Sequence, residues 1–221
     1  EAPFDEVQDS LEDVRLVNRY LGGYRVLLYY IRNFIKRHPL DKEFLVLDLA
    51  TGSADQPIVV VDMARQLNVK IKVVALDINS KMLNYAHEKI RAYPEIHLVQ
   101  GDIHSPPFGE NSFDVVMNSL SLHHFTRIQA VNILRMADLM SRSGFIINDL
   151  HRSRIAHAFI LILTRLVTKN RLTRHDAPVS VMNAFTPSEM AEMAQEAGVK
   201  CFTVNRHFPY RIGLVSTRKD Y

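Results

Sequence analysis

Residues 44–55 read Phe-Leu-Val-Leu-Asp-Leu-Ala-Thr-Gly-Ser-Ala-Asp. The first six are apolar apart from Asp48, which is typical of a buried strand, and a turn that contains Gly52 follows them. A helical stretch then extends to about Leu67. A strand, a short turn and a helix in this order begin a βαβ unit, so this stretch predicts an α/β protein.

The alternation of strand and helix continues toward the C-terminus. Further strands are expected at 70–77, 96–101, 113–119, 143–149, 201–206 and 213–217, and helices at 80–91, 127–140 and from Thr186 to near Gly198. Two helices, 11–21 and 24–36, precede this core, and an apolar helix is expected at 154–169 after the fifth strand. The pattern predicts a doubly wound, mostly parallel, seven-stranded sheet with N-terminal helices and a helical insertion.

Length and composition narrow the class of protein. The 221 residues are 47% hydrophobic and 23% charged, which is typical of one soluble domain. A net charge of +3 does not indicate a nucleic-acid partner. Cys201 is the sole cysteine, so no internal disulfide is expected, and the longest apolar run is far shorter than a membrane span. We expect a cytoplasmic protein that is a monomer or a homodimer. Peripheral contact with a membrane remains possible on these observations.

Acidic residues stand at or beside the ends of three successive strands: Asp48, Asp77 and Asp102. Ligands of such sheets bind at the carboxyl ends of the strands, near the point where the strand order reverses. A carboxylate in the first loop can accept from an ammonium group or order the turn, and the sequence leaves both roles open for Asp48. At the second strand a carboxylate can accept from both hydroxyls of a ribose. At the third it can accept from the amine of an adenine.

The first loop does not suit a phosphate. It carries Gly52 alone, where the dinucleotide fingerprint G-x-G-x-x-G needs three glycines, and Ala54 and Asp55 crowd the position of the phosphates. A ligand with a ribose, an adenine and a cationic amino-acid tail fits better. S-adenosylmethionine has that composition.

Four ordered motifs carry a resemblance to class I S-adenosylmethionine-dependent methyltransferases. They are VLDLATGSAD (46–55), ALDINS (75–80), QGDIHSPPF (100–108) and FDVVMNSLSLHHF (113–125). The first is similar to the D-x-A-T-G-x-x-D form of ubiquinone/menaquinone-biosynthesis methyltransferases, except that Ala54 replaces a second glycine and is expected to narrow the methionine pocket. NRYLGG (18–23), NDLHRS (148–153) and RLTRHDAPVS (171–180) resemble methyltransferases found beside bacterial type III polyketide synthases.

The resemblance implies a Rossmann-like methyltransferase sheet and a set of cofactor contacts. The first loop would contact the methionine portion of the cofactor through its backbone, and the end of the second strand would bind the ribose. The end of the third strand would lie beside the adenine, and the end of the fourth would lie beside the methyl group that is transferred. The expected cofactor-binding residues are Asp48, Ala50, Thr51, Gly52, Asp55, Asp77, Ile78, Asp102, Ile103, Asn118 and Ser119. The chain then divides into an N-terminal helical cap (1–40), a cofactor-binding core (41–150), a substrate lid (151–185) and a C-terminal helix with strands (186–221).

Histidines are the candidate bases, because a phenol or enol acceptor is mostly protonated at neutral pH. His151, after the fifth strand, is the preferred base and His124 the second candidate. His123 is expected to contact substrate, although a structural role for His123-His124-Phe125 remains an alternative. No metal site is predicted, since no suitable cysteine or carboxylate spacing accompanies these histidines.

The helix at 154–169 is predicted to act as a lid over the acceptor. Its residues Ile155, Phe159, Ile162 and Leu166 recur at helical spacing, so this face should bury itself against the domain, a second subunit or a ligand. A packed helix with a solvated basic tail, or contact with an anionic membrane surface, are alternatives. The expected substrate-binding residues are His123, Phe159, Leu163, Arg174 and His175.

These observations predict methyl transfer from S-adenosylmethionine to a small hydrophobic acceptor, aromatic or polyketide/quinone-like, with O-methylation favoured over C-methylation. Two alternatives come from other classes. One is a catalytically silent methyltransferase-like protein that binds a ligand or partner. The other is a nucleotide-dependent oxidoreductase, against which the missing glycines of the first loop argue.

Overall fold

The computed structural model describes residues 4–39 and 41–218, so the predicted segments 1–40 and 186–221 extend beyond it at residues 1–3, 40 and 219–221. The strands are β1 (Phe44–Leu49), β2 (Ile71–Asp77), β3 (Ile96–Gln100), β4 (Phe113–Ser119), β5 (Ser141–Leu150), β6 (Phe202–His207) and β7 (Arg211–Ser216). The helices are α1 (Phe4–Tyr20), α2 (Gly23–Ile35), α3 (Asp55–Gln66), α4 (Ser80–Lys89), the 3₁₀ turn η1 (Leu122–His124), α5 (Arg127–Met140), α6 (Arg154–Val167), α7 (Arg171–Asn183) and α8 (Pro187–Glu196).

The seven strands form one sheet in the order β3-β2-β1-β4-β5-β7-β6. The pairs from β3 to β5 are parallel, whereas β7 pairs antiparallel with both β5 and β6. The strand order reverses between β1 and β4, which is where a doubly wound sheet binds its ligand. The predicted α/β, Rossmann-like, mostly parallel seven-stranded sheet is confirmed.

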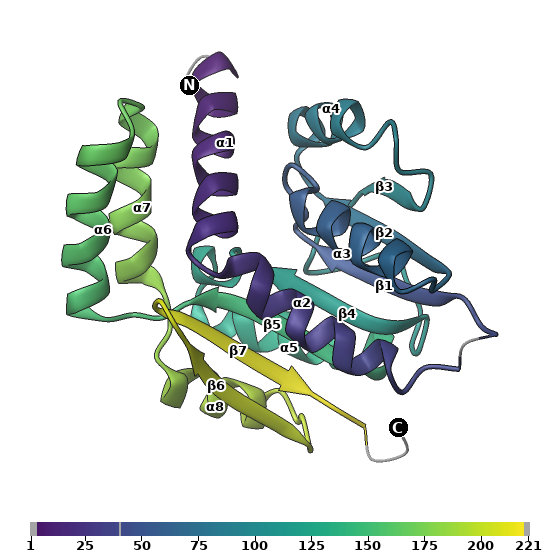
Figure 1. Cartoon of the computed structure of the whole chain (residues 1–221). Helices are drawn as coiled ribbons and strands as arrows, with labels where there is room; N and C mark the ends of the chain where they lie inside the picture. Colours follow the sequence, from purple (N-terminus) through teal and green to yellow (C-terminus); the bar gives the residue numbers. More distant parts are fainter. Residues whose placement is uncertain (1–3, 40, 219–221) are drawn as a thin grey trace.

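Helices cover both faces of the sheet (Figure 1). α2, α3 and α4 pack on one face and α5 and α8 on the other. Val46 contributes to the first layer and Leu47 to the second, and neither side chain is exposed. This explains why β1 is apolar except at Asp48, since a strand covered on both faces has no solvated side.

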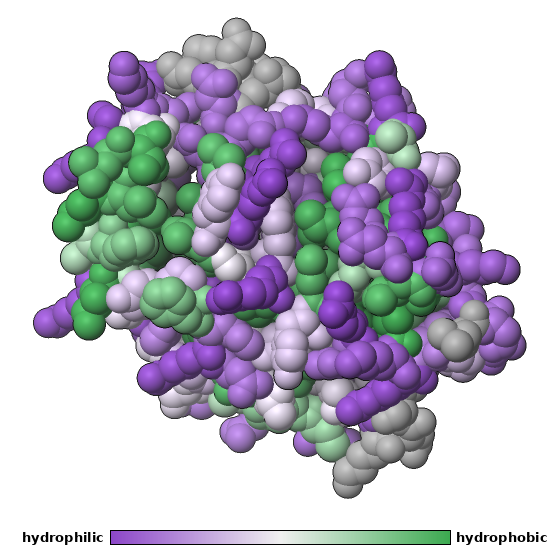
Figure 2. Space-filling view, in the orientation of Figure 1, coloured by the Kyte–Doolittle hydropathy of each residue, from purple (hydrophilic) through white to green (hydrophobic). Residues whose placement is uncertain are grey.

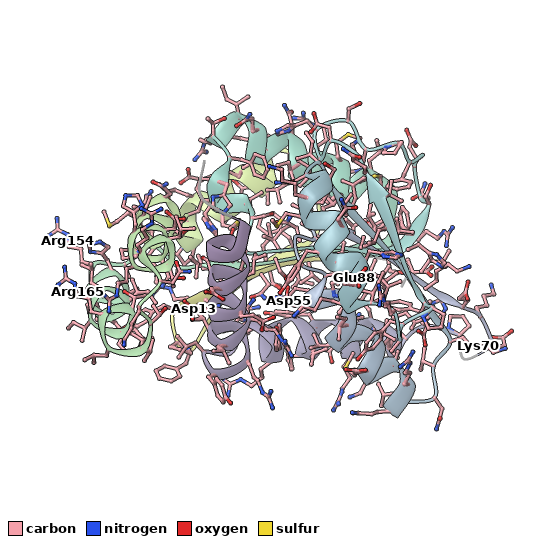
Figure 3. The ribbon with its side chains drawn as sticks, turned by 90° about the horizontal axis from the view of Figure 1, so that it is seen from above. Asp13, Asp55, Lys70, Glu88, Arg154 and Arg165 are labelled. Atoms are coloured by element: carbon pink, nitrogen blue, oxygen red, sulfur yellow. The ribbon has the colours of Figure 1, made fainter. Side chains whose placement is uncertain are left out.

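Three helices, α1, α6 and α7, stand beside the sheet rather than on its faces (Figure 1). α1 lies between α7 on one side and α3 and α4 on the other. The Asp13 carboxylate accepts from Thr168 Oγ1 at 2.6 Å and Thr173 Oγ1 at 2.8 Å, on the side of α7 (Figure 3). Glu12 accepts from Tyr85 Oη at 3.0 Å and pairs with Lys89 of α4. α1 thus connects the two sides of the molecule.

The insertion after β5 differs from its prediction in two ways. The basic stretch after α6 is a second helix, α7, because Asn170 caps it by accepting from the backbone N–H groups of Leu172 and Thr173. It continues through Pro178, which is buried. α6 and α7 pack side by side as a helical hairpin (Figure 1).

The face of α6 expected to be buried is exposed. Ile155, Phe159, Ile162 and Leu166 are 69, 41, 61 and 78% exposed and form part of an apolar surface over α6 (Figure 2). The prediction that this face packs against the domain is wrong, because α6 buries its other side, Ala156, Ile160 and Thr164. That a second subunit or a ligand covers this face remains a prediction. No helix in the described part of the chain is long and apolar enough to cross a membrane.

Candidate functional site

The turn after β1 has an unusual backbone. Ala50, Gly52 and Ala54 all adopt left-handed φ angles of 56°, 56° and 59°, and Leu120, after β4, has a φ of 55°. Residues with a side chain rarely adopt this conformation, and such strain gathers at ligand sites. A Cβ placed on Gly52 would meet no atom within 4 Å, so space is open beside it. The two strained turns flank the point of strand reversal.

Asp77, at the end of β2, organises this turn. Its Oδ2 accepts from the backbone N–H of Gly52 at 2.8 Å, and its Oδ1 accepts from that of Asn79 at 2.9 Å. The carboxylate therefore joins the ends of β1 and β2 and carries a negative charge at the predicted ribose position. A carboxylate has about four acceptor positions, so two ribose hydroxyls can still be accommodated.

The predicted adenine contacts lie at the tips of β2 and β3. Ile78 is 66% exposed, whereas Ile103 is buried. Asp102 is exposed and its Oδ1 accepts from the backbone N–H of His104 at 2.8 Å. The edge therefore offers an apolar surface beside a carboxylate, which suits a purine that carries an exocyclic amine.

Several buried polar atoms at this edge have no hydrogen-bond partner among the described residues. They include Asp48 Oδ2 on β1 and Asn118 Oδ1 and Ser119 Oγ at the end of β4. Asn118 is fully buried, and its Nδ2 donates to the Leu49 carbonyl at 2.7 Å. Unpaired buried groups cost about 1–3 kcal/mol each unless a ligand satisfies them. Their clustering at the carboxyl ends of β1 and β4 indicates a polar ligand there.

Asp55 determines which ligand fits. It begins α3, and its Oδ2 accepts from Tyr24 Oη at 2.8 Å and Asn18 Nδ2 at 3.3 Å. A cavity of about 400 Å³ between α1, α3 and α4 is lined in part by Ser53 and Asp55. A carboxylate at this helix start repels phosphate but not an ammonium group. The residues present therefore fit S-adenosylmethionine better than a dinucleotide.

A second cavity, of about 160 Å³, lies beside the turn after β4 and between that turn, α1 and the α6–α7 hairpin. Most of its wall is apolar, from Val17, Leu120, Leu150, Ile160, Ala177 and Val181. Its polar side chains include His123, His124, Thr173 and Arg211. The strained turn after β4 connects it to the cofactor edge, because Asn118 and Leu120 are two residues apart.

His123 forms a buried pair with Asp149. Its Nδ1 lies 2.6 Å from Asp149 Oδ1, and its backbone N–H donates to Oδ2 at 3.0 Å. Burial raises the pKa of Asp149, but the charge and hydrogen bonds of His123 and the N–H of Leu150 outweigh this and hold that pKa below its usual value. Asp149 is therefore ionised and accepts from Nδ1–H, which leaves Nε2 as the basic ring nitrogen.

Comparison with known proteins agrees with this geometry. Residues 46–144 match the model of a methyltransferase domain. A demethylmenaquinone methyltransferase of Thermotoga maritima is 26% identical over 69% of this chain and 69% of its own length. One from Lactobacillus johnsonii is 34% identical over 42% of this chain, and the match spans 38% of that relative. A structure described as a putative S-adenosyl-L-methionine-dependent methyltransferase from Methanococcus maripaludis superposes with a TM-score of 0.64 over 100% of this chain and 96% of its own, at 15% identity.

The chain resembles the class I S-adenosylmethionine-dependent methyltransferases both in its methyltransferase domain and in its fold. The resemblance that the four motifs predict is thereby confirmed, with S-adenosylmethionine as the cofactor. Which residues of this methyltransferase contact the cofactor remains a prediction, which the strand-end geometry supports.

Asp48 should make the stability of the methyltransferase depend on pH. It is 1% exposed, and burial, reinforced by the negative charges of Asp55 and Asp77, raises its pKa to about 8. Between about pH 4 and 8 the folded state keeps a proton that the unfolded state has lost, so unfolding becomes easier as pH rises. We expect the free energy of unfolding to fall by about 2 kcal/mol between about pH 6 and 8.

Urea denaturation of the wild type and of Asp48→Asn checks this prediction. The variant keeps the side-chain shape without an ionisable group, so its unfolding free energy should change less with pH over the same range. Parallel pH dependence in the two proteins would show that Asp48 ionises normally in the folded state.

The structure brings only some of the predicted substrate and catalytic residues to the apolar cavity. His123 and His124 line it, and burial and the charge of His123 lower the pKa of His124. His151 is not among its lining residues, and its backbone N–H donates to the Tyr210 carbonyl at 2.9 Å. Burial, followed by the charge of Arg206, lowers the pKa of His151.

The other predicted substrate residues lie around the α6–α7 hairpin. Phe159 packs near Tyr210 and lines a small adjoining cavity of about 40 Å³, while Leu163 is partly buried within the hairpin. Arg174 is exposed and donates to the Thr168 carbonyl at 2.8 Å, and His175 is exposed and pairs with Asp176. Neither Arg174 nor His175 is among the residues that line the apolar cavity.

Sequence reasoning missed two groups, one behind the wall of this cavity and one that lines it. Asp149 had a signal, since it lies near the end of the strand next to the one that precedes His123. Arg211 had none, because it lies before the strand predicted at 213–217 and far from every motif.

Proposed function

We propose that this methyltransferase transfers the methyl group of S-adenosylmethionine to a hydroxyl group of a small, hydrophobic acceptor, aromatic or polyketide/quinone-like, bound in the apolar cavity. The observation that carries the proposal is that His123, in the wall of that cavity and beside the end of β4, is paired at its Nδ1 with the buried Asp149. The apolar walls suit a conjugated ring, and the pair supplies a base for its hydroxyl proton.

The chain's own residues divide the work. The bound cofactor supplies an electrophilic methyl group on a sulfonium centre. His123 Nε2 accepts the hydroxyl proton, which frees the acceptor oxygen to attack, while Asp149 holds the ring and balances the imidazolium charge. The α6–α7 hairpin and α1 enclose the acceptor and limit water, and the strand ends fix the cofactor.

This proposal gives the base to His123 rather than to His151 or His124, because, among the described residues, a buried carboxylate lies on the Nδ1 of His123 and not on that of the other two. The relatives named demethylmenaquinone methyltransferase support a quinone-like ring as acceptor. A relative from Wigglesworthia glossinidia brevipalpis that is named ubiquinone/menaquinone biosynthesis C-methyltransferase makes C-methylation the main alternative outcome.

Two measurements test the proposal. Calorimetry should show S-adenosylhomocysteine binding and no NADH binding, whereas binding of NADH alone would favour an oxidoreductase. Incubation of cell extracts with isotopically labelled S-adenosylmethionine, followed by untargeted mass spectrometry, should reveal a labelled O-methyl ether on a hydrophobic acceptor. A labelled C-methyl product would refute O-methylation, and cofactor binding without any labelled product would indicate a silent binding protein.

A further inference from the structure

Arg211 is a charged side chain that has no counter-ion among the residues that the structure describes. It is the first residue of β7, is 2% exposed and lines the apolar cavity together with His123. Its Nη2 donates to Asn18 Oδ1 at 3.1 Å, and its Nη1 has no partner among the described residues. A guanidinium that is buried and half-satisfied is costly to the fold.

No other group in the described part of the chain neutralises this charge. Arg211 forms no ion pair there, and the carboxylate whose charge reaches it, Asp149, is already held by His123 and two backbone N–H groups. Burial lowers the pKa of Arg211 to about 10, opposed by Asp149, so the guanidinium remains protonated at neutral pH. The cavity therefore holds one fixed positive charge among mostly apolar walls.

Arg211 is also held in place from the cofactor side. Asn18 accepts from Arg211 and donates to Asp55 Oδ2 at 3.3 Å, so a single amide joins the cavity to the start of α3. Asn18 is itself 2% exposed. The orientation of the guanidinium is thus fixed by a buried side chain before any acceptor binds, which is what an anion subsite needs.

We propose that Arg211 is the acceptor-specificity residue and that it binds the acceptor as an oxyanion, so that the substrate class is acidic phenols and enols rather than neutral alcohols. The inference rests on the proposed function. An acceptor with an ionised oxygen on a conjugated ring matches the cavity in three ways. The oxygen pairs with the one positive charge, the base beside its carboxylate takes the proton, and the ring packs against the apolar walls. The proton leaves the hydroxyl for His123 Nε2, and the guanidinium stabilises the oxygen that remains.

The test uses 4-nitrophenol as a probe, because its visible absorbance reports ionisation, with 4-nitroanisole as the neutral match. Both are titrated into the protein saturated with S-adenosylhomocysteine, at a pH below that of half-ionisation of the free phenol. The wild type should bind the phenol in its coloured, ionised form and at least about ten-fold more tightly than the anisole. Arg211→Met should lose that preference and the colour while binding the anisole as before.

Controls separate the possible causes. Arg211→Lys keeps the positive charge but lacks the two-pronged donor geometry of a guanidinium, so it should retain part of the preference for the phenol over the anisole. Arg91→Met removes an exposed arginine that follows the C-terminal end of α4, and it should change neither the affinity for the two probes nor the colour of the bound phenol. Binding of both probes with equal affinity by the wild type, no binding of the phenol, or full ionisation in Arg211→Met would each overturn the inference. Absence of S-adenosylhomocysteine binding would instead defeat the proposed function, so the two failures are distinguishable.

Discussion

Replacing His123 by glutamine should lower the rate of methyl transfer to the labelled acceptor by about 10²–10⁴-fold, the usual contribution of a positioned base. Glutamine keeps a hydrogen-bonding side chain of similar reach but cannot take a proton. S-adenosylhomocysteine affinity should be unchanged, because the cofactor edge is formed by other residues. Rates under saturating acceptor, with calorimetry of each variant, measure the two effects separately.

The neighbouring histidines provide matched controls for this prediction. His124→Gln and His151→Gln should each reduce the rate far less than His123→Gln, since neither has a carboxylate at Nδ1. Asp149→Asn tests the positioning residue. Without the anion that orients the ring and balances the imidazolium charge, the rate should decrease while the affinity for S-adenosylhomocysteine stays unchanged. A large loss in His151→Gln with normal activity in His123→Gln would reassign the base.

Much of the fold follows from local patterns in the sequence. β1 and β4 begin and end where the apolar runs predict, because both are buried on the two faces of the sheet and their sequences contain little else. α8 begins at Pro187 after Thr186, and the predicted capping box with Glu189 is formed. The order of the strand-end acids likewise predicts which edge carries the ligand, since parallel strands end together.

The parts that could not be predicted depend on contacts between distant segments. Apolar residues of α6 lie on more than one face of the helix. Periodicity alone therefore could not show that Ala156 and Ile160 face inward while Ile155 and Ile162 face solvent. Arg211 reaches the acceptor cavity only because β7 inserts antiparallel beside β5. A sequence pattern contains no signal for that pairing, whereas the His123–Asp149 contact follows from neighbouring parallel strands.

Asp77→Ala should weaken binding of S-adenosylmethionine by about 1–3 kcal/mol, or roughly 5- to 150-fold in dissociation constant, because the ribose loses a charged acceptor. The structure adds a second consequence. Asp77 also accepts from the N–H groups of Gly52 and Asn79, so the variant loses the tie between β1 and β2 and should unfold about 1–2 kcal/mol more easily. The core below these strand ends is untouched, so the variant should remain folded.

Calorimetry and urea denaturation together distinguish direct ribose binding from a purely structural role of this carboxylate. Asp77→Asn keeps one acceptor oxygen without the charge, so its affinity should lie between those of the wild type and Asp77→Ala. Glu110→Ala, which removes an exposed acid from the loop before β4, should alter neither quantity. If Asp77 binds the ribose, the binding free energy of S-adenosylmethionine should fall more steeply than the free energy of unfolding from the wild type through Asp77→Asn to Asp77→Ala. A folded Asp77→Ala protein with unchanged affinity would place the ribose elsewhere, and equal losses in both quantities would mean that Asp77 acts only by holding the Gly52 turn.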